Sequence, residues 1–128
     1  MFKKSLVAVT LFFSIAATST ANAQSMADKE ITVQQAAGDV YMLQGPGGNI
    51  GVLATDKGLL LVDDKFAPLA EKIESAMKGL EDKDLKYIIN THFHGDHTGS
   101  NQFFSHKAPI FAHENVRSRL SSKADHSV

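Results

Sequence analysis

A six-residue run in the second half of the chain, His-Phe-His-Gly-Asp-His, carries three imidazoles and one carboxylate. Zinc binds both groups at roughly 2.0–2.2 Å, which requires side chains that converge from different directions. His92 and His94 are two apart in an extended segment, so they are predicted to project to one side and bind one ion together. Gly95 is expected to let the chain turn, so that Asp96 and His97 face a second ion. The run predicts a metal site rather than histidines that decorate a loop.

The elements that must position this run follow from the pattern of apolar residues before and after it. Runs rich in β-branched and apolar residues predict strands at Ile31–Val33, Val40–Leu43, Gly51–Ala54, Leu59–Val62, Leu85–Asn90 and Pro109–Ala112. Helices are predicted at Pro68–Leu80, Thr98–Phe104 and Glu114–Leu120. This order of elements predicts an α/β fold in which helices cover a sheet.

Two turn signals define predicted hairpins in the first half. The glycine-rich stretch Gly45–Asn49 lacks the Gly-Lys-Ser/Thr ending of a phosphate-binding loop, so it is interpreted as a hairpin turn. Asp56–Gly58 predicts a second turn, before Leu59–Val62. That strand is apolar on both faces, which is typical of a strand buried between layers.

The histidine run resembles the H-x-H-x-D-H motif of the metallo-β-lactamase superfamily. The resemblance extends from about Asp39 to Arg119 and includes the early hairpins and the strand end Leu60–Asp64. It implies a metallo-β-lactamase-like αββα sandwich, of which the chain holds about the first half, a mixed sheet with covering helices.

The resemblance also implies roles for the motif residues. His92 and His94 would bind the first zinc ion, and Asp96 and His97 the second. A water or hydroxide bridging the ions would attack an ester, thioester, amide, lactam or related bond of a small-molecule substrate, with Asp96 orienting it. Iron or manganese could replace zinc, and a β-lactamase is one specific alternative for the complete protein.

Other polar residues have competing interpretations. Asp63 or Asp64, at a strand end, would either hold a metal ligand in place or cap a turn. His113 is a weaker candidate ligand, because a histidine at a helix start often has no metal. His106 and His126 are interpreted as surface residues.

The amino terminus has the pattern of a cleaved signal peptide. Lys3 and Lys4 precede the apolar run Leu6–Ala17, which is too short to span a bilayer, and Ala21-Asn22-Ala23 is a cleavage site. Residues 1–23 are therefore a predicted signal peptide, 24–38 a flexible lead with the first strand, and 39–128 the truncated domain. We expect an exported protein, periplasmic or secreted, without a membrane anchor after cleavage.

Composition limits the possible ligands and partners. The 13 basic and 14 acidic residues leave no basic patch that would favour nucleic acid. Because cysteine is absent, any metal must be held by nitrogen and oxygen. The sequence does not determine the oligomeric state.

The family resemblance further implies that a later half supplies the remaining ligands, namely a histidine, a bridging aspartate and a final histidine. We therefore expect the chain to be an incomplete fragment of a hydrolase whose sheet exposes one apolar face. The alternatives are a non-catalytic zinc-binding or partner-binding half-domain that completes itself by dimerisation, and a remnant that does not fold.

Overall fold

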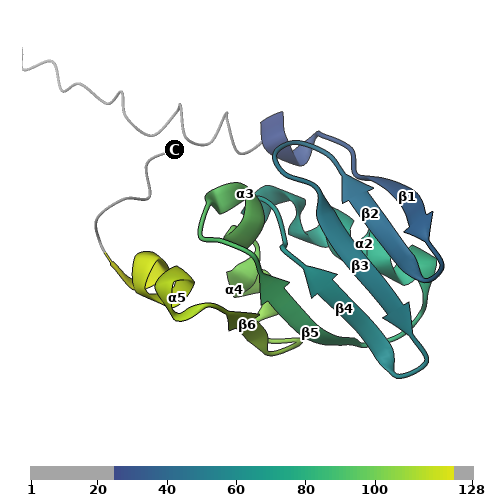
Figure 1. The fold of residues 1–128 in the computed structure, drawn as a ribbon. Helices are drawn as coiled ribbons and strands as arrows, with labels where there is room; N and C mark the ends of the chain where they lie inside the picture. Colours follow the sequence, from purple (N-terminus) through teal and green to yellow (C-terminus); the bar gives the residue numbers. More distant parts are fainter. Residues whose placement is uncertain (1–24, 123–128) are drawn as a thin grey trace, which may run out of the picture.

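The computed structural model describes residues 25–122, which form one six-stranded sheet with helices packed against it (Figure 1). The predicted signal peptide and His126 lie outside the described residues. The strands are β1 (Thr32–Ala37), β2 (Val40–Gln44), β3 (Ile50–Thr55), β4 (Gly58–Val62), β5 (Leu85–Asn90) and β6 (Ile110–Ala112). They lie side by side in chain order. The predicted mixed sheet with covering helices is confirmed.

Strand direction changes at the centre of the sheet. The pairs from β1 to β4 are antiparallel, as the two predicted hairpins require, whereas β4 pairs with β5 and β5 with β6 in parallel. Parallel neighbours end at the same edge of a sheet. The segments that follow β4 and β5 are therefore adjacent, and the Asp63 N–H donates to the Ile89 carbonyl at 2.8 Å.

The amphipathic helix begins slightly later than the sequence predicts. Pro68 lies in a single 3₁₀ turn, η1 (Ala67–Leu69), and the α-helix α2 (Ala70–Leu80) follows. The fixed φ of proline suits a first helical turn. Ile73 and Met77 on its apolar face are buried, which holds α2 against the sheet.

The predicted helix Thr98–Phe104 is wrong in its bounds. Two short helices, α3 (Gly95–Thr98) and α4 (Asn101–Phe104), replace it, so the first begins inside the histidine run. The expectation for Gly95 is also wrong. Gly95 is not among the glycines with positive φ, and a Cβ at this position would meet nothing within 4 Å. The chain turns because it enters a helix after the extended His94, and this needs no glycine.

The predicted flexible lead packs against the domain. Residues 25–27 form a helical turn, Met26 packs against the core, and the Lys29 N–H donates to the Met26 carbonyl at 3.1 Å. The last helix, α5 (Glu114–Ser121), agrees with the prediction to within one residue.

The two faces of the sheet differ. On one face, β-strand side chains join α2 and α4 in a buried core that includes Leu43, Ile50, Val52, Leu61, Ile73, Met77, Ile88 and Phe104. The other face is apolar but exposed. Val40, Leu53 and Tyr87 lie in one row across it, and Ile89 pairs with Phe111 beside them; all five are exposed. No helix among the described residues covers this face (Figure 1), which confirms the exposed apolar surface that the sequence indicates.

Within residues 25–122, no helix combines the length and the apolar content needed to cross a bilayer.

Candidate metal centre

The four predicted metal ligands come together where β5 ends and α3 begins. His92 and His94 lie on the connecting segment, and Asp96 and His97 lie in the single turn of α3. The ring centroid of His92 is 4.9 Å from that of His94 and 4.0 Å from that of His97. All four side chains are at least partly accessible. A bound ion at this position would therefore be reachable from solvent.

The spacing of the ligand atoms fits a metal. Asp96 Oδ2 lies 3.4 Å from His97 Nε2, and two ligands on a tetrahedral zinc ion, each at roughly 2.1 Å, are separated by about 3.4 Å. Ligand atoms of His92, His94 and Asp96 also lie within 4.8 Å of one another. The division into one ion on His92 and His94 and a second on Asp96 and His97 stays a prediction.

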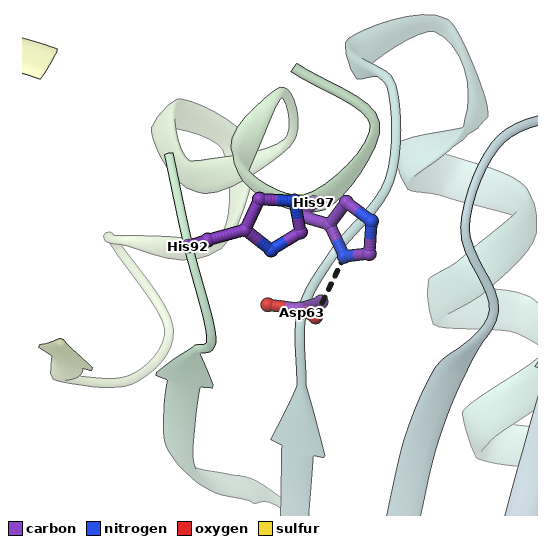
Figure 2. Close-up of side chains that lie close together, drawn as sticks. All are labelled: Asp63, His92 and His97. Carbon is purple, nitrogen blue, oxygen red and sulfur yellow. Dashed lines mark hydrogen bonds and ion pairs between the residues drawn. The ribbon is translucent and has the colours of Figure 1, made fainter. Parts of the chain in front are cut away.

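Asp63 fixes the orientation of one imidazole. It follows β4 with a left-handed φ of 63° and is 3 % exposed. Its Oδ2 lies 2.7 Å from His97 Nδ1, the contact drawn as a dashed line in Figure 2. A carboxylate accepts hydrogen bonds, so His97 must carry its proton on Nδ1. His97 Nε2 is then left with a lone pair for a metal, as in carboxylate–histidine–metal arrangements.

Thr91 links Asp63 to a second imidazole, that of His92, and fixes its tautomer in the same way. Its N–H and its Oγ1 hydroxyl each donate to Asp63 at 2.7 Å. The hydroxyl has only one hydrogen, so it must accept from His92 Nδ1, which lies 3.0 Å away. His92 Nε2 is thereby also left as the acceptor nitrogen. Sequence analysis did not single out Thr91, although a hydroxyl between a strand and a histidine was the signal available.

A second group of possible ligand atoms consists of Asp63, His92 and His97, within 4.8 Å of one another. Figure 2 shows the two imidazoles side by side above the carboxylate. Because Asp63 already accepts hydrogen bonds from His97 and Thr91, we interpret it as the residue that orients ligands rather than as a ligand.

Asp64 acts as a cap rather than as a residue that orients a histidine, because its carboxylate binds a backbone N–H just before α4. Its Oδ1 accepts a hydrogen bond from the Ser100 N–H, just before α4, at 2.9 Å. The side chain is buried, and its Oδ2 has no hydrogen-bond partner. Burial raises the pKa of Asp64 to about 7; the Ser100 bond lowers it only in part, and the charge of Asp63 raises it further. The two adjacent aspartates therefore divide the roles that the sequence left open.

The glycine-rich loop between β2 and β3 forms one wall of the site. The Gly48 N–H donates to Asp96 Oδ2 at 2.8 Å. Cβ atoms built on Gly47 and Gly48 would lie 2.6 Å from Asp96 Cβ and 2.3 Å from His97 Nε2, so glycine permits the close approach. Burial would raise the pKa of Asp96, but the Gly48 bond and the neighbouring His97 and His92 lower it below its usual value. The sequence indicated only a hairpin turn here.

The two other histidines within residues 25–122, His106 and His113, lie outside the cluster of predicted ligands. His113 is the N-cap of α5, where its Nδ1 accepts from the Asn115 N–H at 3.2 Å. His106 is exposed. Neither belongs to a group of converging ligand atoms among residues 25–122.

The chain is similar to one known protein family and to several solved structures. The family model described as the metallo-beta-lactamase superfamily matches residues 43–116. Among solved structures, a Cronobacter sakazakii metallo-beta-lactamase with a HARLDQ motif superposes with a TM-score of 0.67 at 20 % identity, covering 78 % of this chain and 40 % of that one. A B3 metallo-beta-lactamase with an active-site glutamic acid superposes with a TM-score of 0.68 at 22 % identity. The match covers 86 % of this chain and 42 % of that one.

A third solved structure, a metallo-beta-lactamase from Hirschia baltica, gives a TM-score of 0.64 at 19 % identity and covers 73 % of this chain and 47 % of that one. At these identities the likeness shows a shared fold. The chain spans less than half of the length of each of these three structures.

Proposed function

The chain belongs to the metallo-beta-lactamase superfamily, and on that premise we propose that its histidine run contributes ligands to the metal centre of a hydrolase. One observation carries the proposal. Through Asp63 and Thr91, the hydrogen-bond network sets the tautomers of His97 and His92 so that both keep Nε2 free as an acceptor, and His97 Nε2 lies 3.4 Å from Asp96 Oδ2. Structural histidines that merely pack would not need this arrangement.

The chemistry proposed is metal-assisted hydrolysis. A zinc ion lowers the pKa of a coordinated water and polarises the oxygen of the group to be cleaved. His92, His94, Asp96 and His97 would hold the metal, and Asp96, which is kept ionised by its lowered pKa, would orient the water. Its anchored Oδ2 suits that role, since the Gly48 N–H restricts the rotation of the carboxylate.

Zinc is the metal we propose, because imidazole and carboxylate ligands suit it and the 3.4 Å between Asp96 Oδ2 and His97 Nε2 is the separation expected of two ligands on one tetrahedral ion. Iron and manganese also bind such ligands. Metal analysis of the protein purified without added metal, followed by reconstitution with each ion separately, tests this assignment. Zinc at a stoichiometric level supports it, and retention of iron or manganese in preference to zinc contradicts it.

Hydrolysis should be tested on the protein produced from the full reading frame of its gene, because this chain covers less than half of the length of the matched structures. We expect Asp96→Ala to lower turnover by about 100-fold or more and His92→Ala to lower metal content. His106→Ala is the matched control, since that histidine is exposed and outside the site. Unchanged hydrolysis in purified Asp96→Ala protein would contradict the proposal.

The substrate is proposed only as a class, a small molecule with an ester, thioester, lactone, phosphoester or lactam bond. The matched structures are metallo-beta-lactamases, so a β-lactam belongs in the test panel beside the other four classes. Zinc binding without hydrolysis of any panel member would favour a non-catalytic zinc-binding domain instead.

We also propose that the protein is exported after removal of residues 1–23. Amino-terminal sequencing of protein recovered from the periplasm or the medium tests this directly. A mature start at Gln24 supports export, whereas intact protein beginning at Met1 in the cytoplasmic fraction contradicts it.

A further inference from the structure

Lys65 is the largest fully buried side chain in the part of the chain that the structure describes. It lies two residues after Asp63 and has a left-handed φ of 58°. Its Nζ donates to the Gly48 carbonyl in a short hydrogen bond and to the Pro46 carbonyl at 3.3 Å. Both acceptors belong to the glycine-rich loop that lines the metal site. A buried ammonium group with two such acceptors ties this loop to the end of β4.

Burying this ammonium group works against stability unless its charge is compensated. Burial lowers the pKa of Lys65, and the negative charge of Asp96 opposes that shift. Sequence neighbours Asp63 and Asp64 direct their carboxylates to His97 and to the Ser100 N–H. The Lys65 amine therefore binds the two loop carbonyls, and the same loop binds Asp96 through the Gly48 N–H.

The contacts form a continuous chain from Lys65 to a predicted ligand. Lys65 binds the carbonyl of Gly48, and the N–H of the same residue donates to Asp96 Oδ2 at 2.8 Å. That oxygen is the one that lies 3.4 Å from His97 Nε2. A displacement of the loop by about 1 Å would break the Gly48 bond, because the donor–acceptor distance would leave the range of roughly 2.7–3.2 Å in which N–H···O hydrogen bonds form.

We propose that Lys65 is a positioning residue of the metal centre, which acts through the loop Pro46–Gly48 to hold the Asp96 carboxylate in the orientation that binds metal. The ammonium group itself does not touch a metal or a substrate. It sets the place of the Gly48 N–H, and the Gly48 N–H sets the rotamer of Asp96. The expected effect of Lys65 on metal affinity rests on the proposed metal site. The expected effect of Lys65 on the position of the loop is independent of any metal.

The test compares Lys65→Met, which keeps the length of the side chain and removes the charge and the donors, with Lys72→Met. Lys72 is the matched control because its Nζ also donates to a backbone carbonyl, that of Lys29, at 2.8 Å and away from the site. We expect Lys65→Met to weaken zinc binding by about 10-fold, the lower end of the effect of losing a residue that supports a ligand. We expect Lys72→Met to leave zinc affinity unchanged.

The second readout is the backbone amide resonance of Gly48 in the metal-free protein. In the unaltered chain this resonance should shift when Asp96 is replaced by Asn, because the Gly48 N–H donates to Asp96 Oδ2, and in Lys65→Met this dependence should be lost. Lys65→Gln retains one donor group and should restore part of both effects. A lysine that merely stabilised the fold would lower the melting temperature and leave the Gly48 resonance and the zinc affinity of the folded protein unchanged, and that result would overturn the proposal.

Two outcomes keep this inference separate from the proposed function. If the unaltered chain binds no zinc, the proposed metal site fails, yet the Gly48 resonance still decides the role of Lys65. If Lys65→Met does not fold, hydrogen exchange of the Gly48 amide in the unaltered chain decides it. Protection comparable to that of the β2–β3 ladder supports the anchored loop, and exchange as fast as in the turn Asp56–Gly58 overturns it.

Discussion

Asp63 and His97 are 34 residues apart in the sequence and are joined by a 2.7 Å hydrogen bond between Oδ2 and Nδ1. The parallel pairing of β4 with β5 makes this contact possible, because it brings the ends of both strands to one edge. The consequence is chemical as well as geometric. A carboxylate at Nδ1 leaves Nε2 unprotonated, which is the form of histidine that binds a metal.

Asp63→Asn should weaken zinc binding by about 10-fold to 100-fold while the fold remains intact. The amide that replaces the carboxylate can donate to His97 Nδ1, which would move the imidazole proton to Nε2 and block the ligand atom. Competition with a chromophoric chelator measures the affinity. Asp39→Asn, in the turn between β1 and β2 and exposed, is the control. Equal affinities in the two variants would show that Asp63 does not set the tautomer.

Two glycines near the site should respond in opposite ways to alanine. Gly48→Ala places a Cβ 2.3 Å from His97 Nε2, so the loop or the imidazole must move, and we expect a loss of zinc affinity of about 10-fold or more. Gly95→Ala meets nothing within 4 Å and has no positive φ. We expect it to bind zinc normally and to gain up to about 1 kcal/mol of stability from the helical preference of alanine.

Zinc titration and urea unfolding of both glycine variants check this pair. Gly79→Ala, in α2 with open space around it, is the control for helical preference alone. A Gly95→Ala variant that lost zinc while Gly48→Ala kept it would reverse our interpretation of the motif.

Local patterns were sufficient to predict most of the fold. The strand Leu85–Asn90 was predicted with the bounds that the structure has, because its apolar run is bounded by charged residues on one side and by the histidines on the other. The two hairpins were marked by their turn residues. By contrast, α3 and α4 have four residues each, and so short a helix shows no period of apolar residues.

The contacts that line the site could not be predicted from the sequence, for a different reason. Gly48 and Asp96 are 48 residues apart, and the acceptors of Lys65 precede it by 17 and 19 residues. Nothing next to Lys65 in the sequence distinguishes it from a solvated lysine. Only the pairing of β2, β3, β4 and β5 brings these groups together, and that pairing is a property of the whole sheet.

The exposed apolar face of the sheet should make the chain self-associate. Exposed patches of this kind favour association, and Leu53, Tyr87 and Ile89 contribute to this one. We expect Ile89→Thr, which keeps a β-branched side chain in β5, to reduce light scattering and the binding of a hydrophobic dye. Val33→Thr is the control, since Val33 is comparably exposed but pairs with the buried Leu43 on the opposite face. Equal scattering from both variants would mean that this face does not drive association.

The metal-free chain should lose stability as the pH rises from about 4 to about 7, because burial opposes the ionisation of Asp64. The folded-state pKa of Asp64 is about 7, against 3.8 for the free side chain. Between these values the unfolded chain has released a proton that the folded chain still holds. Raising the pH therefore favours unfolding, by up to about 1.4 kcal/mol per pH unit, and the contribution is constant below and above the range. Asp96 makes stability depend on pH only at pH values below the usual pKa of aspartate, because its pKa in the folded chain is lowered.

Urea unfolding at pH 5 and pH 8 in the presence of a chelator measures this dependence. Asp64→Asn has no carboxyl group to ionise and can still accept the Ser100 N–H bond, so its stability should change less between the two pH values. Asp39→Asn keeps Asp64 and should follow the unaltered chain. If Asp64→Asn loses as much stability as the unaltered chain between pH 5 and pH 8, another group is responsible and the assignment to Asp64 is wrong.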